Sequence, residues 1–251
     1  MQSHEEVVNT FMKKIYRGAL KPDARLPTEK RLAEELELDR GALRIGLRQL
    51  ESMGVIRIRH GDGMYVRDYM KSAGLDFLKT LFMVREAKGE DPVIDDYLID
   101  EIWEFWIMLF PAVVEMAAVK LSSRDMRALT GLLDEELENI SDRDKVIELE
   151  VLSHDLIVNM ADNTILTLLF NSCLPFRQRI VSLQIRDMTR EELTEHIESK
   201  RALVAYFMTS GPSDMDAVIK TFTQRMENYR SKLRRKAFGA DRANQREGGS
   251  R

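Results

Sequence analysis

The sequence is short of the residues and patterns that mark several classes of protein. Its 251 residues include one cysteine, Cys173, which excludes an intramolecular disulfide framework and a multi-cysteine metal cluster. The most apolar stretch, 102–119, is interrupted by Glu104, Pro111 and Glu115, so no run approaches the roughly 20 apolar residues that cross a bilayer. The first six residues are polar and acidic, unlike a signal peptide. These absences predict a cytoplasmic protein with no membrane partner.

The chain also lacks a net positive charge, since its 38 Lys and Arg are outnumbered by 42 Asp and Glu and its net charge is −4. The charge is uneven, however. Residues 1–68 hold 13 Lys and Arg against 11 Asp and Glu, a net charge of about +2, which leaves about −6 for the remainder. DNA binding requires a basic surface on one domain rather than a basic whole. The amino-terminal part is therefore where contact with nucleic acid is to be sought.

Three helical patterns follow one another near the amino terminus. Apolar residues recur at i, i+3 and i+4 spacing over 5–18, and the pattern returns after Thr28 and again after Asp39. Thr28 and Asp39 are the expected N-caps of the second and third helices. Gly54 is expected to end the third helix, because glycine readily adopts the left-handed conformation found there.

A change of period follows the third helix. Residues 55–59 alternate apolar and charged side chains, as a half-buried strand does, and 60–63 form a tight turn with two glycines. Residues 64–66 return as a second strand. Three helices and then a hairpin, in this order, predict a winged helix-turn-helix over residues 1–68.

The expected third helix begins with the residues that a helix-turn-helix presents to base edges in the major groove. Arg40 and Arg44 lie four residues apart, hence on one helix face, where they can contact guanine or phosphate. Gly41 and Ala42 lack bulk and allow a close approach to the groove.

Further contacts are expected from the neighbouring elements. Lys30 and Arg31 open the preceding helix, where side chains usually meet phosphate, and His60 and Gly61 lie at the wing tip. Each feature alone is also explained by a solvated helix face or an ordinary turn. Their order, together with the apolar pattern, favours DNA contact.

The remainder of the chain shows helical patterns and no strand pattern. A linker is expected at 69–73, and six or seven helices joined by short polar turns predict an all-α bundle over 74–236. The tail, 237–251, is basic and is expected to be disordered. It is either a solvated end or an arm that contacts DNA.

At this point the sequence resembles the GntR family of bacterial transcription regulators. The matching segments are 26–33, 38–44, 50–56 and 60–66. The resemblance implies that Lys30, Arg40, Arg44, His60 and Gly61 occupy positions that touch operator DNA. Asp39 departs from the family, which commonly has Ser or Thr there, and we expect it to act as a cap rather than to face phosphate.

An all-helical domain after such a head is similar to the FadR subfamily, whose bundle binds a small-molecule effector. The resemblance implies a homodimer that binds a palindromic operator with effector-dependent affinity, and no enzymatic activity. Two other functions remain open. One is an enzyme with a catalytic metal in the bundle, although the chain lacks a nucleophile motif and a phosphate-binding loop. The other is a protein-interaction bundle in which Trp103 and Trp106 form an interface.

Many relatives hold a metal in this bundle through one carboxylate and three histidines. The matching positions here are Glu150, His154, His196 and Gln224. Glu150 and His154 share a helix face, and His196 can reach them from another helix, which gives a donor set that suits Zn²⁺ or a similar divalent ion. Gln224 is a poor ligand, so histidines that simply belong to the core remain the alternative.

Two aromatic residues depart from the relatives that bind carboxylic acids. Those relatives carry Arg where Trp106 stands and Glu where Phe110 stands, and the replacements remove polar anchors. With Trp103, His154 and His196, these residues predict an effector pocket that accepts an apolar ligand such as a fatty acyl chain. The alternatives are an ordinary core helix and a metal-dependent sensor of small carboxylic acids.

Overall fold

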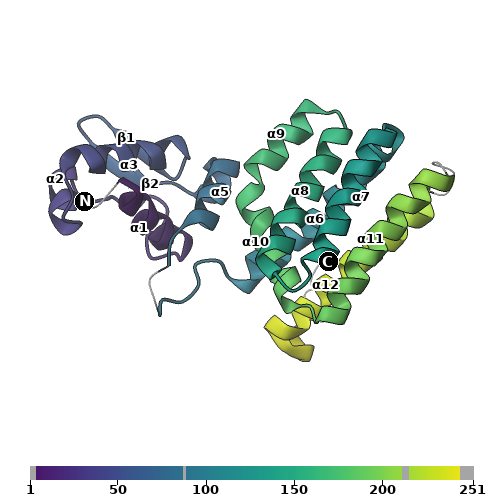
Figure 1. Cartoon of the computed structure of the whole chain (residues 1–251). Helices are drawn as coiled ribbons and strands as arrows, with labels where there is room; N and C mark the ends of the chain where they lie inside the picture. The colour runs from purple at the N-terminus through teal and green to yellow at the C-terminus, as the bar shows by residue number, and fades with distance from the viewer. Residues whose placement is uncertain (1–3, 87–88, 211–214, 244–251) are drawn as a thin grey trace, which may run out of the picture. The chain divides into compact units, whose positions relative to one another are not determined.

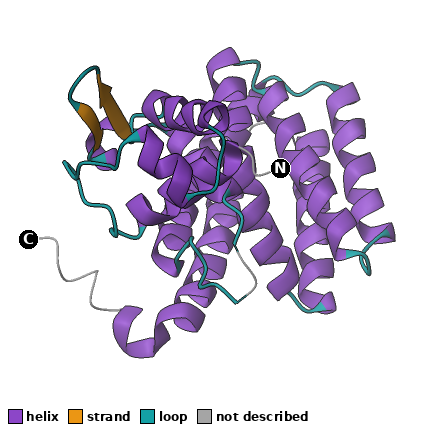
Figure 2. Ribbon diagram, turned by 90° about the vertical axis from the view of Figure 1, so that its left-hand side faces the viewer, coloured by secondary structure: helices purple, strands orange, loops and turns teal. Residues whose placement is uncertain are grey.

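The computed structural model describes residues 4–86, 89–210 and 215–243, and the chain divides into two compact units, Met1–Asp95 and Asp96–Arg251 (Figure 1). The described residues are mainly helical, with a single two-stranded hairpin (Figure 2). The predicted fold class, a winged helix-turn-helix followed by an all-α bundle, is thereby confirmed.

The first unit has the element order of a winged helix. Its elements are α1 (His4–Tyr16), α2 (Glu29–Glu35), α3 (Arg40–Ser52), β1 (Ile56–Arg59) and β2 (Gly63–Val66). The side chains that the sequence pattern placed inward form its core. They include Val7, Phe11, Met12, Ile15, Leu32, Leu43, Leu47, Leu50, Ile56 and Val66.

Helices α1 and α3 pack closely because Gly46 lies where they meet. A Cβ added at Gly46 would come within 2.6 Å of the Val7 Cβ atom. The predicted caps are present as well. The Asp39 carboxylate accepts hydrogen bonds from the amides of Gly41 (2.8 Å) and Ala42 (2.9 Å), which satisfies two donors that the first turn of α3 leaves unpaired.

The hairpin pairs Ile56 with Val66 and Arg59 with Gly63, and its turn spans residues 60–62 (Figure 2). The loop between α1 and α2 pairs with the edge of this hairpin, which the sequence pattern did not predict. The amide of Leu26 donates to the Met64 carbonyl (2.8 Å), and the amide of Val66 donates to the Ala24 carbonyl (2.9 Å).

The linker expected at 69–73 is instead a short helix, α4 (Tyr69–Ser72), followed by α5 (Leu75–Met83). Asp68 caps α4, and the Ser72 hydroxyl donates to the Gly54 carbonyl (2.7 Å). Gly54 has a φ of +77°, and a Cβ there would overlap the Ser72 carbonyl. These contacts join α4 to the winged helix. The first compact unit also includes α5 and ends at Asp95.

The second unit contains seven helices among its described residues. They are α6 (Asp96–Val119), α7 (Ser123–Glu138), α8 (Arg143–Met160), α9 (Thr164–Ser172), α10 (Leu174–Asp187), α11 (Arg190–Ser210) and α12 (Met215–Ala243). Helix α12 continues past residue 237, where the disordered tail was expected to begin, with a change of direction at Gly239. Residues 244–251 of that expected tail lie outside the described residues.

Helix α6 is long and apolar enough to cross a membrane by length and composition, contrary to the expectation from the sequence. In the structure it packs against α8, α10 and α12. Trp103, Trp106, Phe110, Pro111 and Val113 are buried there. This burial accounts for the apolar character of α6, because the core helix of a bundle has the same length and composition.

Candidate functional site

The residues predicted to contact DNA lie on the surface of the first unit. Arg40, Gly41 and Arg44 are exposed on the first turns of α3, and Ala42 between them is half-buried. Lys30 is exposed at the start of α2. The two helices thus present their amino-terminal basic residues to solvent, as the docking of a recognition helix requires. The DNA contacts themselves stay a prediction.

Two of the arginines predicted to contact DNA, Arg44 and Arg31, form ion pairs with glutamates in this structure. Nε of Arg44 lies 2.8 Å from Oε2 of Glu29, and Nε of Arg31 lies 2.7 Å from Oε1 of Glu35. Arg48 follows Arg44 by one helical turn, and its side chain is 77% exposed. It extends the row that Arg40 and Arg44 begin, and the i, i+4 spacing that identified those two would also have found it.

The wing tip is organised by side chains from outside the turn. His60 and Gly61 are exposed, and Gly61 has a φ of +75°. The Asp62 carboxylate accepts a hydrogen bond from the Tyr65 hydroxyl (3.1 Å), and the Arg25 guanidinium donates to the Asp62 carbonyl. The Arg59 guanidinium lies 3.4 Å from the other oxygen of the Asp62 carboxylate, so the negative charge at the tip is balanced.

In the second unit, aromatic rings surround His154. The Trp106 and Phe110 rings stack with centroids 4.6 Å apart, and their centroids lie 5.1 and 4.6 Å from that of His154. The Trp103 ring is 5.0 Å from that of Tyr229 on α12. Burial lowers the pKa of His154, which makes its neutral form dominant despite the nearby Glu150 carboxylate.

Two cavities adjoin these rings. The main cavity, of about 780 Å³, lies among α10, α11 and α12. The aromatic recess, of about 80 Å³, is lined by all five residues predicted for the effector pocket. The two share six lining residues, namely Gln184, His196, Lys200, Leu203, Phe222 and Met226.

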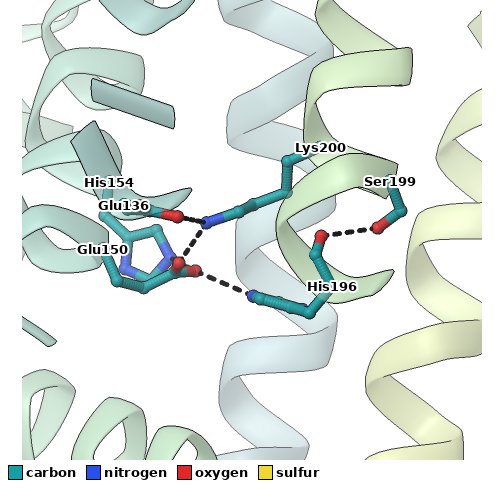
Figure 3. A network of polar contacts seen from close by, with 6 residues as sticks. All are labelled: Glu136, Glu150, His154, His196, Ser199 and Lys200. Atoms are coloured by element: carbon teal, nitrogen blue, oxygen red, sulfur yellow. Dashed lines mark hydrogen bonds and ion pairs between the residues drawn. The ribbon is translucent and has the colours of Figure 1, made fainter. Parts of the chain in front are cut away.

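A buried polar group that we call the Lys200 cluster lies at this boundary. It consists of Glu136 on α7, Glu150 and His154 on α8, and His196 and Lys200 on α11 (Figure 3). The Lys200 ammonium lies 2.7 Å from Oε2 of Glu136 and also forms an ion pair with Glu150. His196 and His154 each place Nε2 near Oε1 of Glu150, at 3.4 and 3.5 Å.

Burial and charge act differently on the two glutamates. Burial raises the pKa of Glu136 to about 7, although the Lys200 ammonium opposes this shift. Burial also acts on Glu150, but there Lys200 and His196 prevail and hold the pKa well below its usual range. The same carboxylates keep the pKa of Lys200 raised in spite of its burial. The cluster thus combines an ionised lysine with an ionised Glu150.

The residues predicted as metal ligands meet, but they do not fit a metal. Among the described residues, no group of three or more His, Cys, Asp or Glu side chains is arranged to hold an ion. Gln224, at the fourth matching position, is exposed, and its amide contacts Glu227 and Asn228. Nδ1 of His154 is buried with no partner among the described residues, whereas a ligand histidine normally donates its second nitrogen to a carboxylate, a carbonyl or water.

Lys200 and Glu136 are not among the residues that the sequence pattern predicted for this site. A signal was present for Lys200, which follows His196 by four residues just as His154 follows Glu150. Both pairs therefore share a helix face. Glu136 is fully buried on α7, and nothing in its local sequence indicates this.

Comparisons with known proteins match each unit separately. Residues 4–66 match the model described as bacterial regulatory proteins, gntR family, and residues 101–208 match the FCD domain. Mce2R of Mycobacterium tuberculosis, an HTH-type transcriptional regulator, is 35% identical over 133 residues, 53% of this chain and 51% of that protein. The chain thus spans about half the length of this relative.

Two further likenesses cover more of the chain. The fatty acid metabolism regulator protein of Haemophilus influenzae is 27% identical over 187 residues, 74% of this chain and 73% of that protein. The solved structure of Lar, described as controlling expression of the Listeria monocytogenes agr system, has a TM-score of 0.58 at 16% identity. It covers 93% of this chain and 98% of that chain, and it supports the fold alone.

Proposed function

Because this chain joins a GntR-family DNA-binding domain to an FCD domain, we propose that it is a bacterial transcription regulator whose grip on operator DNA responds to a small molecule. The observation that carries the proposal is the row of exposed arginines that begins at the first residue of α3. In a helix-turn-helix this end of the second helix enters the major groove. The cellular location that goes with this role is the cytoplasm.

DNA recognition is assigned to three elements. Arg40 and Arg44 on α3 read base edges or bind phosphate, while Gly41 and Ala42 allow the helix to approach the groove closely. Lys30 and Arg31 on α2, together with His60 and Gly61 at the wing tip, contact the backbone. These side chains supply a local basic surface on a chain whose net charge is −4.

The active form is proposed to be a homodimer, because a two-fold dimer presents two recognition helices to a palindromic operator. Val119, Ile165 and Leu168 support this, since they are apolar and 58–75% exposed on α6 and α9. Light scattering of an Ile165→Glu/Leu168→Glu double variant tests it. The variant is expected to be monomeric and to lose operator affinity, and an unchanged dimer would rule out this surface.

The effector is proposed to be an amphipathic molecule with a long apolar chain, such as a fatty acyl compound. The main cavity has a volume typical of small-molecule sites, and the aromatic recess adjoins it. Trp106 and Phe110 offer no charge to anchor a small acid, whereas Arg225, which is exposed on the lining of the main cavity, can face an anionic head group.

Calorimetry with acyl-CoAs of increasing chain length, and with short hydroxy- and dicarboxylates, tests the effector class. Each buried methylene contributes about 0.8 kcal/mol, so affinity is expected to rise about tenfold for every two carbons. Trp106→Arg is expected to weaken acyl binding, while Met108→Ala, at an exposed position of the same helix, is not. Binding of the short acids alone would reject the acyl proposal.

A metal-dependent sensor of small carboxylic acids is the alternative; its expected ligands Glu150, His154 and His196 lie together, but the Lys200 ammonium on Glu150 disfavours a metal there. Enzymatic activity in the bundle is a third candidate and has no further support from the geometry. Sequencing the DNA that the purified protein retains from fragmented genomic DNA tests the regulator itself. Recovery of one shared palindrome is the expected result, and recovery of unrelated fragments with equal affinity would contradict it.

A further inference from the structure

The Lys200 cluster raises the question of what neutralises its carboxylates. Glu136 is fully buried and Glu150 is nearly so, and an isolated buried carboxylate is strongly unfavourable. In this chain the opposite charge comes from α11, where the Lys200 ammonium lies against one oxygen of each carboxylate (Figure 3). We propose that Lys200 takes the place of a divalent cation in this bundle, so that the second unit folds around its own ammonium group and needs no metal.

The position of the ammonium group carries the argument. It joins α7, α8 and α11 through the two ion pairs, the role that a bound cation plays when it draws ligands from several helices. A divalent ion held by Glu150 would stand beside this ammonium, and the two positive charges would repel each other.

Removal of the lysine should uncover a cation site. Nε2 of His154 and Nε2 of His196 lie 3.5 and 3.4 Å from the same oxygen of Glu150. Neighbouring ligands of a tetrahedral zinc ion, with bonds of 2.0–2.1 Å, are separated by about 3.3 Å. Glu136 adds a fourth donor once Lys200 no longer occupies it. Lys200→Ala therefore leaves two carboxylates and two imidazoles around an empty volume.

The experiment compares thermal unfolding of the full chain in EDTA and in excess Zn²⁺, alongside the metal content of the purified protein. For the wild type we expect no bound divalent metal and a Tm that differs by less than about 1 °C between the two conditions. For Lys200→Ala we expect a lowered Tm in EDTA. Zn²⁺ at about a hundred times its Kd should then raise that Tm by about 5–10 °C.

Two controls isolate the cluster. Lys220→Ala removes an ammonium from an exposed position of α12 outside the cluster and should respond to EDTA and Zn²⁺ as the wild type does. Lys200→Ala/His196→Ala should lose the response to Zn²⁺. A wild type that contains stoichiometric metal, or that melts earlier in EDTA, overturns the proposal whether or not the variants fold. A folded Lys200→Ala that ignores Zn²⁺ overturns it too.

Discussion

Replacing Arg44 by alanine distinguishes base reading from simple attraction to phosphate. Arg44 stands on the second turn of α3, four residues after Arg40, with its side chain 66% exposed. In the free protein its guanidinium pairs with Glu29, and DNA would exchange this partner for a guanine edge or a phosphate oxygen. The substitution removes the guanidinium without disturbing the buried face of α3.

The expected loss follows from this geometry. An arginine that reads guanine contributes about 1–3 kcal/mol to binding, so operator affinity should fall about 5- to 150-fold. The fold should hardly change, since the ion pair with Glu29 is partly exposed and surface pairs contribute about 0–1 kcal/mol. The assay is a gel-shift titration on the operator and on a random duplex, with thermal unfolding as the check on folding.

Arg48→Ala is the matched control, because Arg48 lies one turn further from the end of α3 that enters the groove. Removing Arg48 should weaken binding to the operator and to the random duplex by the same factor. It should also reduce the slope of log affinity against log salt concentration by about one. If Arg44→Ala weakens binding to both duplexes equally, Arg44 contacts phosphate. If binding to neither duplex is weakened, the assignment of α3 as the reading helix is refuted.

Three other expectations concern stability. Gly54→Ala should destabilise the first unit by about 1–2 kcal/mol through its left-handed backbone alone. The overlap of the new Cβ with the Ser72 carbonyl adds to this loss. A Tm equal to that of the wild type would contradict the close approach of α4. Asp39→Ala should cost about 1 kcal/mol in urea denaturation, because two amides of α3 lose their acceptor, while Asp39→Asn should retain most of the stability. The pKa of Glu136 is raised to about 7 from an ordinary value of 4.5, so folding favours its protonated form. The free energy of unfolding should therefore decrease as the pH rises from 4.5 to 7. Glu136→Gln should flatten this dependence, and an unchanged slope would assign it to another group.

The winged helix could be predicted because its boundaries are set by local chemistry. Asp39 caps a helix through amides two and three residues away, and Gly54 ends it through its own backbone angle. Contacts between distant segments leave no such trace. The pairing of Leu26 with Met64 and the bond from Ser72 to Gly54 both depend on the folded hairpin, which is why the sequence pattern did not indicate the helix at 69–72.

In the bundle, too, some features could be predicted from the sequence and others could not. Trp106 and Phe110, which line the aromatic recess, could be singled out because their departure from the carboxylate-binding pattern is visible in the sequence. Glu150, His154 and His196 were correctly expected to meet, since spacing and resemblance both indicated it. What completes their environment is Lys200, and its contact with Glu136 joins residues 64 positions apart. No sequence periodicity indicates that contact. Because Lys200 pairs with Glu136 and Glu150, the residues expected to bind a metal form a buried ion-pair network instead.

The contacts around Asp62 have a consequence for the entropy of DNA binding. Arg25 and Tyr65 hold the wing tip in the free protein, so its backbone is already ordered when the proposed complex forms. A glycine-rich turn without these hydrogen bonds would lose its conformational entropy only when it binds the duplex, and this loss would lower the affinity. In this chain the same entropy is lost when the protein folds. The wing of this chain is preorganised, so in the proposed complex it would contribute a rigid surface rather than a loop that becomes ordered on the DNA.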